Sequence, residues 1–141
     1  MNILTEEQKQ EMLDNFGRHL IKEVRDSSLL LSKNIINLET INPVMQKQYA
    51  VLTGISIEQQ EALCNLLSET ITDVIYSFFK MIEWHSDSMK LSLIKDGIEY
   101  DIVEISEEVG SEITFLDDDG WIQRFSEVGY PPIDISVFSE Q

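Results

Sequence analysis

The chain has 141 residues, of which 43% are hydrophobic, and its 26 acidic and 10 basic residues give a formal net charge of −16. This composition excludes an intrinsically disordered chain, and the length predicts a single folded domain spanning residues 1–141. A surface this negative repels phosphate backbones, which argues against direct binding of nucleic acid.

The first residues, the length of the apolar runs and the cysteine content predict the cellular compartment of the protein. The first residues, MNILTEEQKQE, lack the basic start and apolar stretch of a signal peptide. No apolar run approaches the roughly 20 residues that span a bilayer. The single cysteine, Cys64, has no partner for an intramolecular disulfide. These features predict a cytoplasmic protein with no membrane partner.

The first predicted helix covers about residues 5–38. Thr5 and Gln8 match a capping box, in which each residue's side chain bonds the backbone of the other. Apolar residues then recur at three-to-four spacing. The sequence DSS at 26–28 leaves open whether this segment is one continuous helix or two.

Two further helices are predicted over about residues 43–52 and 56–84. Asn42 can cap the first of them and Pro43 suits its first position, while Ser56 begins the second. The longer helix carries one apolar stripe, which predicts a central core helix. The residues of this stripe are Leu63, Leu67, Ile71, Val74, Phe78 and Ile82.

From residue 89 the apolar pattern changes to a period of two, which is typical of strands. Strands are predicted over about 89–95 and 98–105, with Asp96-Gly97 as the hairpin turn. A second pair is predicted over about 112–116 and 121–126. Helices followed by strands predict an α+β fold, in which the helices pack on a C-terminal antiparallel sheet.

The run TFLDDDGW at 114–121 is the most unusual stretch of the chain. Its Asp119-Gly120 fits the fifth and sixth positions of an EF-hand loop, but neither the first nor the twelfth position holds a carboxylate. A calcium loop is therefore excluded. We predict instead a hairpin turn in which Gly120 adopts a positive φ.

The sequence predicts no catalytic residue, no cofactor and no metal. His19 and His85 are isolated from other ligand-type residues, and Cys64 has no neighbouring base in the sequence. The six glycines are scattered singly, so neither a phosphate-binding loop nor a dinucleotide fingerprint is present.

Charge is unevenly distributed along the chain. Residues 1–85 carry 12 acidic and 7 basic side chains, a net charge of −5, whereas residues 86–141 carry 14 and 3, a net charge of −11. Such an acidic region attracts basic protein partners, especially at low ionic strength. The alternative interpretation is that the acidity only keeps the chain soluble.

Three stretches, FGRHLIKEVRDSS (16–28), VIYSFFKMIEWH (74–85) and DGWIQRFSE (119–127), resemble small acidic immunity proteins of bacterial polymorphic-toxin and contact-dependent inhibition systems. The resemblance implies a cytosolic antidote that binds a cognate toxin domain and blocks its active site. Many such toxins are nucleases with basic clefts, so carboxylates would imitate the phosphates of the substrate.

If the resemblance holds, the acidic side chains would supply steering and rim contacts and Trp121 would be the apolar anchor. The alternative for Trp121 is a place in the hydrophobic core. The predicted partner-binding residues are Asp117, Asp118, Asp119, Trp121, Glu107, Glu108 and Glu112. Two alternatives stay open. One is a small enzyme or ligand-binding domain with a cleft between helices and sheet; the other is a helical adaptor or dimer built on the long helices.

Overall fold

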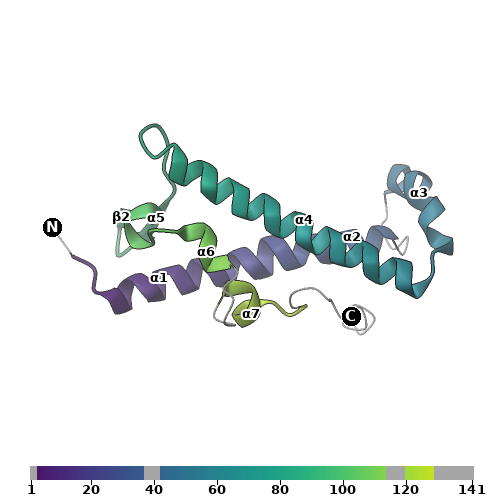
Figure 1. Cartoon of the computed structure of the whole chain (residues 1–141), viewed down its shortest axis with the longest axis horizontal. Helices are drawn as coiled ribbons and strands as arrows, with labels where there is room; N and C mark the ends of the chain where they lie inside the picture. Colours follow the sequence, from purple (N-terminus) through teal and green to yellow (C-terminus); the bar gives the residue numbers. More distant parts are fainter. Residues whose placement is uncertain (1–2, 37–41, 114–119, 129–141) are drawn as a thin grey trace.

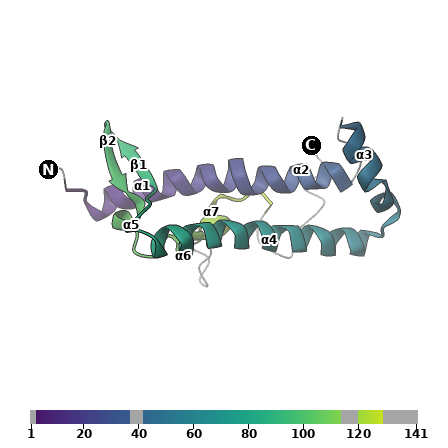
Figure 2. The ribbon, with the colours of Figure 1, turned by 90° about the horizontal axis from the view of Figure 1, so that it is seen from above.

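The computed structural model describes residues 3–36, 42–113 and 120–128 of the chain. Two long helical rods lie side by side and run in opposite directions, with a short β-hairpin at one end (Figure 1, Figure 2). Three short helices pack against the rods between the hairpin and the middle of the molecule. The fold is α+β, as the sequence predicts.

The first rod consists of α1 (Glu6–His19), the π-helical segment η1 (Leu20–Asp26) and α2 (Ser27–Ile36), which follow one another without a break. The predicted capping box is present. Thr5 Oγ1 accepts a hydrogen bond from the Gln8 backbone N–H at 3.1 Å, and Gln8 Oε1 accepts one from the Thr5 backbone N–H at 2.9 Å. The segment is therefore one helical rod, whose winding changes in its middle third.

The buried stripe of this rod explains the change in winding. Every fourth residue is buried, and an α-helix with 3.6 residues per turn would carry such a stripe gradually around its axis. A π-helical turn contains more residues than an α-helical turn and counteracts this drift. The stripe therefore stays directed toward the interior from Leu13 to Lys33. It consists of Leu13, Gly17, Ile21, Arg25, Leu29 and Lys33.

The return path begins with α3 (Pro43–Tyr49) and the short 3-10 helix η2 (Ala50–Gly54), and α4 (Ile57–Trp84) forms the second rod. Asn42 caps α3 by accepting a hydrogen bond from the backbone N–H of Val44 at 3.0 Å. A complete capping box at Ser56 begins α4. These starts agree with the prediction.

The side of α4 that faces the core differs from the predicted stripe. Two members of the predicted stripe, Val74 and Phe78, are 65% and 47% exposed. Apolar residues surround much of this helix, so periodicity identifies the most apolar side, and the fold covers a neighbouring side that includes two hydroxyl groups. The buried residues of α4 are Cys64, Ser68, Thr72, Ile75, Phe79 and Ile82.

The hairpin consists of β1 (Ser92–Lys95) and β2 (Ile98–Asp101), paired antiparallel. The two turn residues have positive φ angles, 52° for Asp96 and 80° for Gly97. A type I′ turn has positive φ angles at both central residues, and its twist matches the right-handed twist of the strands that it joins. The Asp96-Gly97 hairpin is therefore confirmed.

The second predicted strand, 98–105, is only half correct. The chain leaves the strand at Asp101, whose carboxylate accepts a hydrogen bond from the backbone N–H of Val103 at 3.1 Å. An aspartate in this position caps a helix, and α5 (Ile102–Ile105) follows directly. The capping bond explains why the strand ends here.

The predicted strands at 112–116 and 121–126 are wrong over their described residues. The structure has α6 (Val109–Ile113) and α7 (Trp121–Phe125) instead. Each helix has apolar residues at its first and fifth positions. A spacing of four fits both the 3.6-residue turn of a helix and the two-residue repeat of a strand, so these short runs did not distinguish the two.

Gly120 does not adopt the predicted positive φ. Its backbone angles are φ −69° and ψ 162°, and it is the N-cap of α7, where its carbonyl accepts a hydrogen bond from the backbone N–H of Arg124 at 3.1 Å. The predicted hairpin across the aspartates is therefore wrong at its C-terminal side. Residues 114–119 lie outside the described residues.

The hydrophobic core lies between the two rods and the short helices α5, α6 and α7. Gly17 allows a close approach within it, because a Cβ atom at this position would overlap the indole ring of Trp121. The buried members of the core are Leu13, Ile21, Ile75, Phe79, Ile102, Ile105, Val109, Ile113, Trp121 and Ile122.

Candidate functional site

Two of the predicted partner-binding residues lie together on the surface. Glu107 and Glu108 are exposed in the turn between α5 and α6, and Glu104 on α5 is exposed just before them. We call these three residues the acidic turn. None of them forms an ion pair within the described part of the chain, so their negative charges face solvent uncompensated. Asp117, Asp118 and Asp119 lie outside the described residues.

Glu112 takes a different role from the one predicted. It is half-buried on α6 and accepts a hydrogen bond from Ser106 Oγ at 3.1 Å. Burial raises the pKa of this carboxyl, and the Ser106 hydrogen bond opposes part of that rise. Glu112 therefore supports the packing of α6 more than it contributes to an open acidic surface.

Trp121 lies in the core and cannot be the exposed anchor that was predicted. Its side chain is 0% exposed and contacts Phe16 and Phe79 edge-on, with ring centroids 5.8 and 6.4 Å away. The indole Nε1 has no hydrogen-bond partner among the described residues. Aromatic groups packed in this way stabilise a core, so the tryptophan fixes α7 against both rods.

The exposed tryptophan is Trp84, which sequence reasoning passed over. It is 77% exposed in the last turn of α4. Its neighbour Glu83 accepts a hydrogen bond from the backbone N–H of Gly110 at 3.4 Å, which holds this end of α4 against α6. The end of α4 that carries Trp84 therefore lies beside α6, which directly follows the acidic turn, and Figure 1 shows this end of α4 on the same side of the molecule as α5 and α6.

A buried arginine joins the two rods. Arg25 in η1 is 0% exposed. Its Nη2 donates to Ser68 Oγ at 2.7 Å, and its Nε donates to Thr72 Oγ1 at 3.2 Å. These are the two hydroxyl groups on the buried side of α4. Two signals in the sequence could have revealed the site. Arg25 stands in the stripe of every fourth residue, between the apolar residues Ile21 and Leu29. Ser68 and Thr72 lie one turn apart on a helix that is rich in apolar residues.

The same network reaches the chain beyond α7. Arg25 Nη1 pairs with Asp26 Oδ1 at 2.9 Å and donates to Ser126 Oγ at 3.1 Å. The Asp26 carboxylate also accepts hydrogen bonds from Ser126 Oγ at 2.8 Å and from the backbone N–H of Glu127 at 2.8 Å. A buried charge is tolerated only when its polar atoms are paired. The network therefore fixes residues 126–127 on η1.

A second ion pair holds α7 on α1. Arg124 donates from Nη1 and Nη2 to the two carboxylate oxygens of Asp14, at 2.9 and 2.8 Å. The Arg124 hydrogen bonds keep the pKa of Asp14 below its usual value. The Arg124 guanidinium also lies 4.7 Å from the ring centre of Phe125. Bidentate pairs of this kind set orientation as well as distance.

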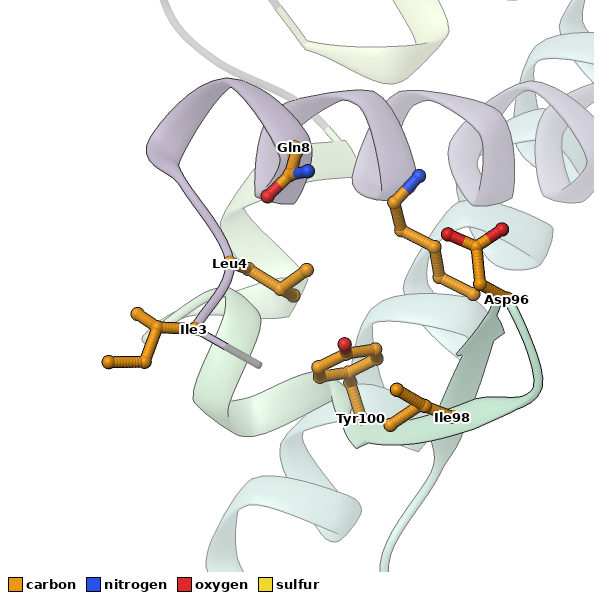
Figure 3. A pocket seen from close by; sticks show the side chains of 7 residues that line it. Ile3, Leu4, Gln8, Asp96, Ile98 and Tyr100 are labelled. Carbon is orange, nitrogen blue, oxygen red and sulfur yellow. The ribbon is translucent and has the colours of Figure 1, made fainter. Parts of the chain in front are cut away.

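Two of the surface hollows differ in what they offer a ligand. One, of about 420 Å³, lies between the start of α1 and the hairpin (Figure 3). Its lining includes Tyr100 and Ile98 from β2 and Gln8 from α1, but Gln8 is engaged in the capping box. Its titratable lining residues, Lys95, Asp96 and Tyr100, all belong to the hairpin, and no histidine, cysteine or serine is among the described residues that line it.

A second hollow is an apolar groove of about 370 Å³ between the first rod and α4. No polar side chain lines it, so it offers shape and apolar area without a group for chemistry. The lining residues are Phe16, Leu20, Val24, Val74, Ile75, Phe78, Phe79 and Leu91.

The described part of the chain offers neither a cluster of metal ligands nor a membrane-spanning helix. Among residues 3–36, 42–113 and 120–128, no group of three or more His, Cys, Asp or Glu side chains could hold a metal ion. Burial raises the pKa of the Cys64 thiol, which disfavours a reactive thiolate. None of the described helices is both long enough and apolar enough to span a bilayer.

Comparison of the chain with protein-family models, with curated proteins and with solved structures gives no match.

Proposed function

We propose that the chain is a cytoplasmic immunity protein that binds a basic toxin domain, of the nuclease class, and blocks its active site. One observation carries this proposal. Ten acidic residues and no basic residue lie between Lys95 and Arg124, and the acidic turn within this stretch is exposed without ion-pair partners among the described residues. The resemblance to acidic immunity proteins points to the same class of partner.

Electrostatics explains how such a surface would act. Unpaired carboxylates at one end of a molecule concentrate the negative potential there and steer a basic partner to that end. In a nuclease cleft they would occupy the positions of substrate phosphates. Association would then be fast at low ionic strength and would slow steeply as salt screens the charges.

Trp84 supplies the apolar part of this interface in the proposal. Charges at a rim mainly affect the rate of association, whereas the lifetime of a complex depends on buried anchors, among which tryptophan is frequent. With 77% of its side chain exposed, Trp84 has most of its surface available for burial by a partner. In the proposal Trp84 takes the anchor role first assigned to Trp121, which is fully buried in the core.

Co-expression with the product of the neighbouring upstream gene tests the proposal, which requires that product to be a toxin. The expected result is loss of toxicity and co-purification of the two proteins. In a rapid-mixing measurement, Glu107→Lys with Glu108→Lys should lower the association rate constant about tenfold or more at low salt and weaken its salt dependence.

The matched control is Glu58→Lys with Glu61→Lys. Both glutamates are exposed in the first turns of α4, at the opposite end of the rod, and the change in net charge is the same. This control should associate almost as fast as the wild type. Absence of rescue by the wild-type chain, or equal slowing by both double variants, would contradict the proposed role of the acidic turn.

A further inference from the structure

One side of α4 is left open by the rest of the fold. Gly110 of α6 packs beside Tyr76 and Lys80 of α4. Val74 lies two residues before Tyr76, and Phe78 lies two residues before Lys80. Since each residue turns an α-helix by about 100°, Val74 and Phe78 point about 200° away from the contacts with α6. They are 65% and 47% exposed. The open side is thus nearly opposite the side that α6 covers.

A row of residues through Val74 repeats with the spacing of helices that pack along one another; four of its members are exposed, and the two leucines at its N-terminal end are half-buried. The separations along the row are four, three, four, three and four, which is the 3.5-residue period of a coiled-coil seam. We call the following set the seam: Leu63, Leu67, Thr70, Val74, Ser77 and Met81. No member is charged. The charged residues of α4 all lie outside it: Glu58, Glu61, Glu69, Asp73, Lys80 and Glu83.

The seam is also nearly symmetric about its midpoint, which is level with Thr72. In an isologous dimer, a two-fold axis brings each residue opposite the one equally far beyond the midpoint. The pairs across such an axis are Leu63 with Met81, Leu67 with Ser77, and Thr70 with Val74. Long side chains meet at the ends and β-branched ones at the centre. Beside Ser77, the ring of Phe78 would fill the space opposite Leu67.

The face formed by the two rods has the dimensions of a standard protein–protein interface. With 28 residues, α4 is about 42 Å long. Together with the neighbouring first rod it presents a face roughly 20 Å wide. The product is on the order of 800 Å², the area that each partner contributes to a standard interface. Leu20 and Val24 of η1 line the groove beside the seam and extend its apolar surface.

The charge of the chain indicates which partner covers the seam. Two copies of a chain with a net charge of −16 repel one another wherever their acidic surfaces meet. An uncharged seam is the surface on which they can approach, whereas a basic partner would gain little there. We infer that the seam is the interface of a two-fold symmetric homodimer, in which α4 packs antiparallel on α4 of a second copy.

Sedimentation equilibrium of the full chain at micromolar concentrations tests this inference. The wild type should sediment with twice the 16.3 kDa mass of one chain. Val74→Asp brings like charges together near the axis and should weaken dimerisation at least about 100-fold. The matched control is Val44→Asp on α3, where the valine is 72% exposed; this variant should dimerise like the wild type.

Ser77→Asp is a second seam variant at an exposed polar position, and it should also dissociate the dimer even if Val74→Asp fails to fold. A wild-type chain of single mass at every concentration, or a Ser77→Asp dimer as tight as the wild type, would overturn the inference. A monomeric wild type whose toxin binding is lost in Val74→Asp would assign the seam to the toxin instead. The Glu107→Lys, Glu108→Lys variant should still dimerise, so this test is separate from that of the proposed immunity function.

Discussion

Replacing Gly17 with alanine tests how tightly the first rod is packed against α7. A Cβ atom at this position would lie 2.6 Å from Cγ of the Trp121 ring, well inside the normal contact distance. The ring cannot easily retreat, since it is 0% exposed and lies between Phe16 and Phe79. The substitution therefore forces the rod and α7 apart.

Two opposing terms set the size of the effect. Alanine in a helix interior is favoured over glycine by about 1 kcal/mol. Overpacking a close-packed core costs about 1–3 kcal/mol, and the upper end applies because the methyl group meets a fully enclosed ring. The net loss in free energy of unfolding should be about 2 kcal/mol, or roughly 4–8 °C in the melting temperature of a chain of this length.

Urea unfolding of Gly17→Ala, followed by circular dichroism and fluorescence, measures this loss. A Trp84→Phe background leaves Trp121 as the only tryptophan, so the fluorescence reports the core directly. The control is Gly54→Ala, because a Cβ atom there meets nothing within 4 Å; it should be neutral or slightly stabilising. If Gly17→Ala gained stability to the same extent as the control, the packing argument would be refuted.

Two further predictions concern charged groups. Arg25→Met leaves the Asp26 carboxylate without its buried cation and should lower the free energy of unfolding by about 3–5 kcal/mol in urea titrations; Lys22→Met on the exposed side of the same rod should change it by less than about 0.5 kcal/mol. Glu112→Gln tests the raised pKa of a half-buried carboxyl. A raised folded-state pKa gives stability that is present at low pH and is lost as pH rises through it. The variant should therefore be more stable than the wild type at pH 7, with the difference vanishing below the ordinary glutamate value of 4.5; a difference independent of pH would contradict this.

Local signals in the sequence predicted the boundaries of the long helices well. Thr5, Asn42 and Ser56 each cap a helix as predicted, because a cap is decided by residues within one turn of it. The Asp96-Gly97 turn was predictable for the same reason. The strand predictions failed in α6 and α7, where five-residue helices depend on tertiary packing more than on their own pattern.

The candidate site was only partly predictable. The excess of acidic residues is a property of composition, and Glu107 and Glu108 are exposed as an interface requires. Which of two tryptophans is buried depends instead on the partners that the fold provides, and the fold buries Trp121 and exposes Trp84. The buried Arg25 network depends likewise on contacts between residues about 45 and 100 positions apart in the chain.

The π-helical segment η1 has a consequence for the length of the first rod. A buried stripe on an α-helix alternates steps of four and three residues, whereas the stripe from Leu13 to Lys33 takes steps of four only. The wider winding of η1 takes the place of the missing three-residue step. The rod therefore contains about one residue more than an α-helix would need to present the same stripe. An additional residue is thus accommodated inside a helix, without a loop, and α2 still faces α4.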